Sequence, residues 1–172
     1  MGILAPKIWI HLQPYQQQRL LTFLGIHYDP QGVGYQIIQS KVAIGSGGFF
    51  GKGFLEGTQT HLRFLPAQHT DFILSVIAEE FGFIAIFFIL AAFTIILIHS
   101  INIAYRTSDK FSSLLVIGIV SSLTFQIFVN IGMITGIVPV AGLPLPFISY
   151  GGSSMVVSVS MVALIHNISS RC

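Results

Sequence analysis

The chain has 172 residues, of which 53% are hydrophobic and only 8% are charged, and its mean hydropathy is +0.81. Soluble domains usually carry about 25% charged residues, so this chain has too little charge to cover a water-facing surface. Its net charge of +2 comes without a basic patch interleaved with aromatic residues, so we expect no nucleic-acid partner. The composition predicts an all-α integral membrane protein.

The first part of the chain is polar apart from its beginning. Residues 1–12 hold a short apolar stretch with no cleavage site after it, and we interpret them as the remnant of a membrane helix rather than as a signal peptide. Residues 13–70 exceed an ordinary connection in length, which usually indicates a functional loop. We expect an ordered surface loop with short or interfacial helices.

A glycine-rich stretch, AIGSGGFFGKG at 43–53, lies within this loop. It fails as a P-loop, because Gly53 stands where a Ser or Thr must bind the metal. A tight turn remains. Its role is either purely structural, or its exposed amides hold a lipid pyrophosphate near Lys41 and Lys52.

Asp71, in the motif HTDF at 69–72, precedes a run from Phe81 to Ile98 without a single charge. A bilayer core of about 30 Å takes about 20 apolar residues in a helix. We therefore predict a membrane helix at 71–99 with Asp71 near the membrane–water boundary, where it serves as an N-cap, a catalytic carboxylate or both. Glu79 would lie about 80° around this helix and about 12 Å along it, too far for two carboxylates that share a proton.

The second predicted membrane helix covers 111–136, after a polar connection at 100–110 on the cytoplasmic side. Ser122, Gln126 and Asn130 recur every four residues along it and form a polar stripe on one face. We attribute this stripe to helix packing, with the lining of a cavity as the alternative.

The end of the chain contains a proline-rich loop and a short third helix. Residues 137–152 hold three prolines, which cannot continue a helix, so we predict an extracytoplasmic loop there. The helix at 153–168 is serine-rich and is plausible only when packed against neighbours. A cytoplasmic tail follows at 169–172. The tail and the connection at 100–110 both hold basic residues, which favours a cytoplasmic position for these two segments. The long loop at 13–70 is then on the outside.

Three long motifs carry a family resemblance: HTDF (69–72), AEEFG (78–82) and VPVAGLPLPFISYGGSS (138–154). They resemble the SEDS family of membrane proteins, and residues 34–72 are most similar to its rod-shape branch. The family has ten membrane spans, and the resemblance aligns this chain with the end of the seventh span through the tenth. It implies that residues 13–70 are the large extracytoplasmic loop of a multi-pass protein of the bacterial cytoplasmic (inner) membrane.

The resemblance also implies an activity: a peptidoglycan glycosyltransferase that polymerises lipid II for cell elongation. The family's essential loop aspartate maps onto Asp71. An α-linked donor that gives a β-linked product undergoes inversion, so one general base suffices, and we assign that role to Asp71. The pyrophosphate leaving group needs cations, so we expect a divalent metal ion, Mg²⁺ or Mn²⁺. The candidate substrate-binding residues are Lys41, Lys52, Gly47, Gly48, His69, Glu79 and Ser149.

The expected partners are lipid II, a class B penicillin-binding protein and membrane proteins of the elongation complex. A lipid II flippase is one alternative, because Pro- and Gly-interrupted spans also mark transporters. A cell-division scaffold for the penicillin-binding protein is another. Since the chain matches only part of the family's spans, we expect it to be inactive alone and assign the activity to its parent protein.

Overall fold

The computed structural model describes residues 13–23, 33–54, 56–57 and 70–170. The predicted helix remnant at 1–12 and the candidate His69 lie outside these ranges. The helices are α2 (Pro14–Phe23), α3 (Val33–Gly47), α5 (Ile73–Arg106), α6 (Lys110–Thr135) and α7 (Gly152–Ser169). No strand occurs in the described residues, and the all-α fold class is confirmed.

Three of these helices are long and apolar enough to cross a membrane. Helices α5, α6 and α7 have 34, 26 and 18 residues, and their most apolar windows have mean hydropathies of 2.9, 2.1 and 1.3. At 1.5 Å per residue, α6 and α7 are about 39 Å and about 27 Å long, which matches a bilayer. Large apolar side chains such as Phe87 and Phe88 remain exposed on α5. The prediction of a multi-pass membrane protein is confirmed.

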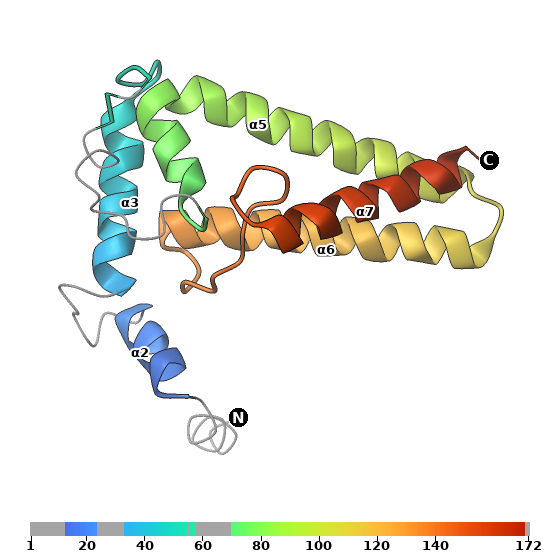
Figure 1. The fold of residues 1–172 in the computed structure, drawn as a ribbon, viewed down its shortest axis with the longest axis horizontal. Coiled ribbons are helices and arrows are strands. Elements are labelled where there is room, and N and C mark those ends of the chain that lie inside the picture. Colours follow the sequence, from blue (N-terminus) through green and yellow to red (C-terminus); the bar gives the residue numbers. More distant parts are fainter. Residues whose placement is uncertain (1–12, 24–32, 55, 58–69, 171–172) are drawn as a thin grey trace.

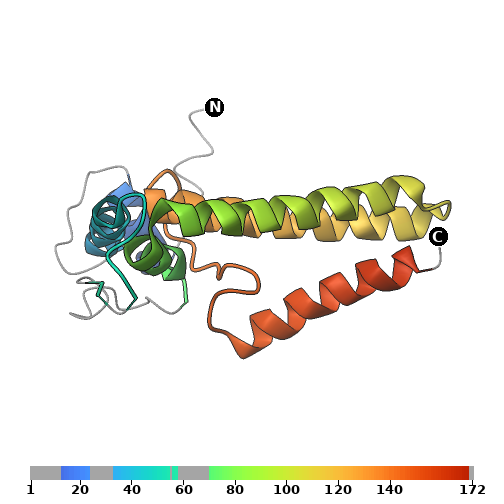
Figure 2. The same cartoon turned by 90° about the horizontal axis from the view of Figure 1, so that it is seen from above.

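The molecule has two distinct ends. Helices α5 and α6 form an antiparallel pair, while α7 diverges from them toward its own N-terminus (Figures 1 and 2). Helix α3, the turn that follows it and the loop at 137–151 gather at one end, whereas the 107–109 connection and the C-terminus lie at the other (Figure 1). The described parts of the two segments predicted to face the outside, α3 with its turn and the 137–151 loop, are therefore on the same side.

Helix α5 continues beyond its predicted end at residue 99. Residues 100–106 are helical, although we expected them in the connection. No Pro or Gly interrupts them, so the helix ends only at Thr107, whose backbone is extended and whose N–H donates to the Ile103 carbonyl. The apolar run marks the membrane-buried part of the helix, and the hydrogen-bonded backbone extends past it.

A sharp bend divides α5 near its beginning. Gly82 has φ 74° and ψ −170°, which are not helical, and Figure 1 shows the first segment turned away from the long second segment. A bend leaves backbone groups without helical partners. The turn after α3 supplies them: the Phe83 N–H donates to Gly48 O at 3.0 Å, and the Lys52 N–H donates to Glu79 O at 2.9 Å.

This pairing requires glycine on both sides of the contact. A Cβ at Gly82 would overlap the backbone nitrogen of Gly51, and a Cβ at Gly51 would overlap the Glu80 carbonyl. Both residues also have positive φ angles. The backbone of the turn and the backbone of the bend approach each other more closely than any side chain allows.

Gly82→Ala is expected to destabilise the fold by at least about 2 kcal/mol, because φ and ψ values of this kind cost about 1–3 kcal/mol outside glycine. The overlap with Gly51 adds to that cost. The measurement is the apparent melting temperature of the purified chain in detergent. Gly118→Ala is the matched control, since a Cβ there meets nothing within 4 Å on α6. Equal melting temperatures for the two variants would contradict the prediction.

Helix α7 satisfies its many hydroxyl groups within itself. Ser154, Ser158 and Ser160 donate to carbonyls of their own helix or of its N-cap at 2.7–2.9 Å. This local bonding removes the cost of exposing hydroxyls to an apolar medium. Among the residues of α7, only Ser158 and Ile165 are buried, and Ile165 joins an apolar cluster with Val116 on α6.

Asp109 begins α6 as its N-cap. Its carboxylate accepts from the Ser112 hydroxyl at 2.6 Å and from the Ser112 N–H at 3.0 Å. These two hydrogen bonds, the hydroxyl first, lower the pKa of Asp109 below its ordinary value. The cap therefore favours the ionised carboxylate.

Acidification is expected to remove the contribution of this cap. Because the folded-state pKa of Asp109 is the lower one, its stabilisation is complete above the unfolded-state pKa of about 3.9 and is lost as the pH falls through the folded-state value. Asp109→Asn keeps a capping oxygen but cannot titrate there. The gap in melting temperature between wild type and Asp109→Asn should therefore shrink below about pH 4. A gap independent of pH would count against this role.

Candidate active site

Asp71 lies in a turn immediately before α5 rather than in its first turn. The N-cap of α5 is Phe72, and no side chain caps the helix. The N-cap interpretation of Asp71 is therefore wrong, and the angle that we predicted between Asp71 and Glu79 does not apply, because residue 71 is not helical. Asp71 is half-buried, and its carboxylate has no hydrogen-bond or ion-pair partner among the described residues. Its Oδ2 lies about 3.7 Å from where a Cβ of Gly142 would stand.

The backbone around Asp71 is held by side chains from α6 and the 137–151 loop. Asn130 Nδ2 donates to Asp71 O at 3.1 Å and to Leu143 O at 2.9 Å. Ser149 Oγ donates to Thr70 O at 2.6 Å. Phe72, the next residue, is fully buried in the apolar core. An acidic side chain without a partner of its own among the described residues therefore sits on a firmly held backbone.

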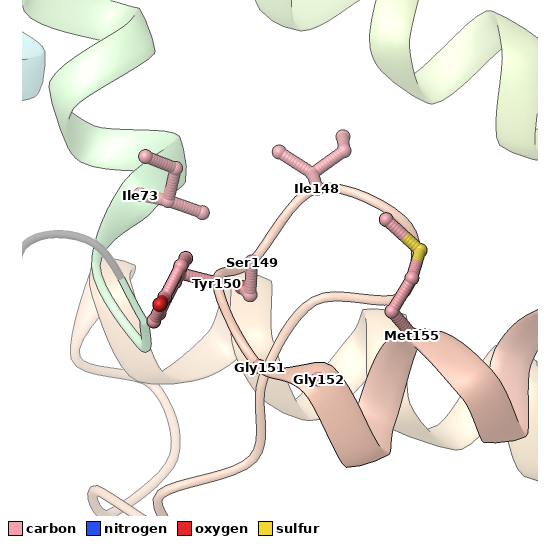
Figure 3. Close-up of a pocket in the computed structure, with 7 residues that line it drawn as sticks. All are labelled: Ile73, Ile148, Ser149, Tyr150, Gly151, Gly152 and Met155. Atoms are coloured by element: carbon pink, nitrogen blue, oxygen red, sulfur yellow. The ribbon is translucent and has the colours of Figure 1, made fainter.

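A cavity of about 590 Å³ opens next to the first residue of α5, and Asp71 itself is not among the residues that line it. Ile73 from the start of α5 and Met155 from α7 lie on opposite sides of it, with Ser149 and Tyr150 between them (Figure 3). Ligand cavities usually measure about 300–1,000 Å³ and combine apolar walls with a few polar groups. The size and lining suit part of an amphiphilic molecule.

Two buried serines join α3 to α5 and α6. Ser40 Oγ donates to Ile134 O at 2.9 Å, and the hydroxyls of Ser40 and Ser75 are 2.7 Å apart. Because the single Ser40 proton goes to Ile134, Ser75 is the donor between the two hydroxyls. Ser75, four residues after Asp71, therefore serves helix packing.

Glu79 is fully buried and pairs with Lys52. The Lys52 Nζ lies 2.8 Å from Glu79 Oε1, and the Lys52 side chain is 29% exposed. The main chain of Lys52 bonds to Glu79 O as well. Both candidate substrate-binding residues thus take part in the contact between the turn and the bend, and Glu79 faces Lys52.

The glycine-rich stretch forms a structural turn whose amides are occupied. The N–H groups of Gly51, Lys52 and Gly53 donate to backbone carbonyls at 2.8–3.1 Å, which corrects the expectation of exposed amides. Gly47 is buried, and a Cβ there would overlap the Ala78 carbonyl. Gly48 is exposed with φ +56°, and its carbonyl accepts from Phe83. These glycines allow close backbone packing.

Lys41 differs from Lys52 in having a free ammonium group within the described part of the chain. It is exposed and lies over Gly136, the left-handed C-cap of α6. A cation there is favoured by the helix dipole. Contact between Lys41 and substrate stays a prediction.

The expected divalent cation has no protein-built centre among the residues that the structure describes. No three His, Cys, Asp or Glu side chains gather there. Mg²⁺ usually takes one or two carboxylates together with substrate phosphates, and Asp71 offers one carboxylate. This donor set does not fit a resident metal centre, and we derive no step through one.

Sequence reasoning missed two contacts that hold the segments around Asp71. Asn130 was assigned to packing, although it bonds to the main chain of Asp71. Arg19 on α2 donates to Val140 O at 2.8 Å and so joins α2 to the 137–151 loop. The spacing of Asn130 on α6 indicated a polar face but not what that face meets.

Comparison with known proteins identifies the family. The family model described as FtsW/RodA/SpoVE cell cycle protein matches residues 1–172. The peptidoglycan glycosyltransferase MrdB of Escherichia coli (strain K12) is 46% identical over 164 residues, which cover 95% of this chain and 44% of that protein. The peptidoglycan glycosyltransferase RodA of Treponema pallidum is 42% identical over 160 residues, which cover 93% of this chain and 37% of the relative.

A relative from the other branch is equally similar. The probable peptidoglycan glycosyltransferase FtsW of Geobacter metallireducens is 46% identical over 157 residues, which cover 91% of this chain and 42% of that protein. A solved structure described as "Structural coordination of polymerization and crosslinking by a peptidoglycan synthase complex" has a TM-score of 0.75 at 33% identity, and the match covers 99% of this chain and 46% of that one. The chain spans less than half the length of these relatives.

Proposed function

Because this chain belongs to the FtsW/RodA/SpoVE family, we propose that it provides the catalytic carboxylate of a peptidoglycan glycosyltransferase that polymerises lipid II. The observation that carries the proposal is the half-buried Asp71 carboxylate, which has no partner among the described residues and lies two residues before Ile73, part of the lining of a cavity of about 590 Å³. The names of the relatives, MrdB and RodA, support the reaction class. The activity belongs to the protein in which this chain works with the family's remaining spans.

The reaction requires one base and a leaving group. The Asp71 carboxylate takes the proton of the acceptor sugar 4-hydroxyl as that oxygen forms a bond to the anomeric carbon of the donor glycan. The bond from this carbon to the pyrophosphate breaks, and the undecaprenyl pyrophosphate leaves with the electron pair. Attack from the opposite face inverts the α-linkage to β, so no covalent intermediate on the protein is needed.

The end of the molecule that holds α3 and the 137–151 loop would face the outer leaflet of the bacterial inner membrane. Asp71, the cavity and Lys41 lie at that end, and the basic residues Arg106 and Lys110 lie at the other, which agrees with the positive-inside rule. The cavity would take part of the lipid-linked substrate, and the ammonium of Lys41 would neutralise phosphate charge. Mg²⁺ or Mn²⁺ carried in by the pyrophosphate remains part of this proposal.

The partners would be lipid II, a class B penicillin-binding protein and other membrane proteins of the elongation complex. The similar solved structure is that of a peptidoglycan synthase complex, which supports an assembly of this kind. Similarity of 34–72 to the rod-shape branch favours elongation. Relatives from both branches match at comparable identity, so a division role is the second possibility.

The test is a chimera in which this chain replaces the matching segment of Escherichia coli MrdB, reconstituted in vesicles with labelled lipid II. An enzyme makes glycan polymer with no ion gradient. A flippase moves lipid II between leaflets without making polymer. Translocation with no polymer, while unmodified MrdB polymerises under the same conditions, would reject the glycosyltransferase proposal.

A further inference from the structure

The two peptide groups next to the Asp71 side chain are each held by one side chain from a distant part of the sequence. Ser149 Oγ donates to the carbonyl before Asp71, that of Thr70, at 2.6 Å. Asn130 Nδ2 donates to the carbonyl of Asp71 itself at 3.1 Å. Because Asp71 precedes the first turn of α5, helical hydrogen bonds do not fix its backbone.

Asn130 occupies its position at a cost. The residue is fully buried, and its Oδ1 has no hydrogen-bond partner within the described ranges. The amide orientation is forced, since two carbonyls, of Asp71 and Leu143, face its nitrogen, and a flipped amide would point oxygen at oxygen. An unpaired buried oxygen lowers stability, and the amide nitrogen offsets that cost by satisfying the carbonyls of Asp71 and Leu143.

The hydroxyl of Ser149 is likewise fully used in hydrogen bonds within the protein. It is 4% exposed, its single proton goes to Thr70 O, and its oxygen accepts from the Leu145 N–H at 2.8 Å. A hydroxyl has one proton to donate. Although Ser149 lines the cavity, it has none left for a substrate.

We propose that Asn130 and Ser149 are positioning residues that hold the peptide groups on either side of Asp71 and thereby aim its carboxylate at the acceptor hydroxyl. The inference rests on the proposed function, because it assigns these residues to the same proton transfer. The Asp71 carboxylate has no partner of its own in the described part of the chain, so its direction is set through the main chain. Displacing a catalytic group by about 1 Å can cost about 10² in rate.

The experiment compares Asn130→Ala with Gln126→Ala in the vesicle chimera. Gln126 belongs to the same polar stripe on α6, but its amide donates only to Ser122 of its own helix among the described residues. Asn130→Ala is expected to lower kcat for lipid II polymerisation by about 10- to 100-fold with KM changed by less than about threefold. Gln126→Ala should stay within about twofold of wild type. Equal kcat values for the two variants would overturn the inference.

Ser149 provides a second test that does not depend on how well Asn130→Ala folds. Ser149→Ala removes the hydroxyl and should lower kcat by about tenfold, whereas Ser149→Thr keeps it and should restore most of the rate. Equal loss in both variants, with normal amounts in the membrane, would contradict positioning by the hydroxyl.

A double variant separates positioning from general structural damage. If Asn130 acts through Asp71, then Asn130→Ala adds no further loss of residual rate in an Asp71→Asn background. An additional tenfold loss there would mean a structural role and would overturn the inference. If Asp71→Asn alone keeps the wild-type rate, the proposed function is wrong. If Asp71→Asn is inactive but Asn130→Ala keeps the wild-type rate, only the positioning inference is wrong.

Discussion

Replacing Asp71 with asparagine is expected to lower lipid II polymerisation by the vesicle chimera by about 10²- to 10⁴-fold, the usual contribution of a general base. Asparagine has the same shape and keeps an oxygen, but its amide cannot take the proton of the acceptor hydroxyl. The carboxylate makes no bond to the other described residues, so its loss leaves the helices in place. The measurement is kcat under saturating lipid II, normalised to the protein in the vesicles.

Asp109→Asn is the matched control for this change. It removes the only other aspartate of the described residues, which lies in the connection at the far end of the membrane helices. It should leave the polymerisation rate within about twofold of wild type, because asparagine is also a good N-cap. Polymer formation by Asp71→Asn at a rate close to wild type would remove Asp71 from the mechanism.

The membrane helices were predictable from the sequence because their signal is local. An uncharged run of apolar residues must be helical in a bilayer, where no water satisfies the backbone. The bend at Gly82 was not predictable in the same way. It depends on hydrogen bonds between the backbone of the turn at 48–53 and that of residues 79–84, which are distant in the sequence. A glycine inside an apolar run does not indicate that such a partner exists.

The candidate site shows the same division between local and distant information. Asp71 stands out in the sequence because a carboxylate beside a membrane span is costly. Asn130 and Gln126 occupy equivalent positions of one stripe, and their spacing on α6 cannot rank them. The 137–151 loop packs against the turn that holds Thr70 and Asp71, through Ser149. This arrangement, which spacing on α6 does not reveal, makes Asn130 the partner of the Asp71 and Leu143 carbonyls.

Lys52 illustrates how a cation beside a glycine-rich turn can have either of two roles. Its position near possible phosphate-binding amides predicted substrate contact, whereas its ammonium lies 2.8 Å from the buried carboxylate of Glu79. Removing one partner of a buried ion pair usually costs about 3–5 kcal/mol, because the other charge is left in an apolar surrounding. Lys52→Met is therefore expected to destabilise the chimera by about that amount and to lower its apparent melting temperature.

The double variant Lys52→Met with Glu79→Gln distinguishes the two roles. It removes both charges, so most of the lost stability should return. If Lys52 acts only by joining the turn to the bend, polymerisation should return with stability. If Lys52 also holds the pyrophosphate, the double variant should be stable but slow, with a raised KM for lipid II.

Lys41→Met serves as the reference for a cation that is predicted to contact substrate and that forms no ion pair with the other described residues. Its side chain is exposed and its ammonium lies at the C-cap of α6, so its loss should cost no more than about 1 kcal/mol, the size of a helix-dipole interaction. We expect its KM for lipid II to rise instead. A Lys52→Met variant as stable as Lys41→Met would show that the ion pair with Glu79 does not hold the turn against α5.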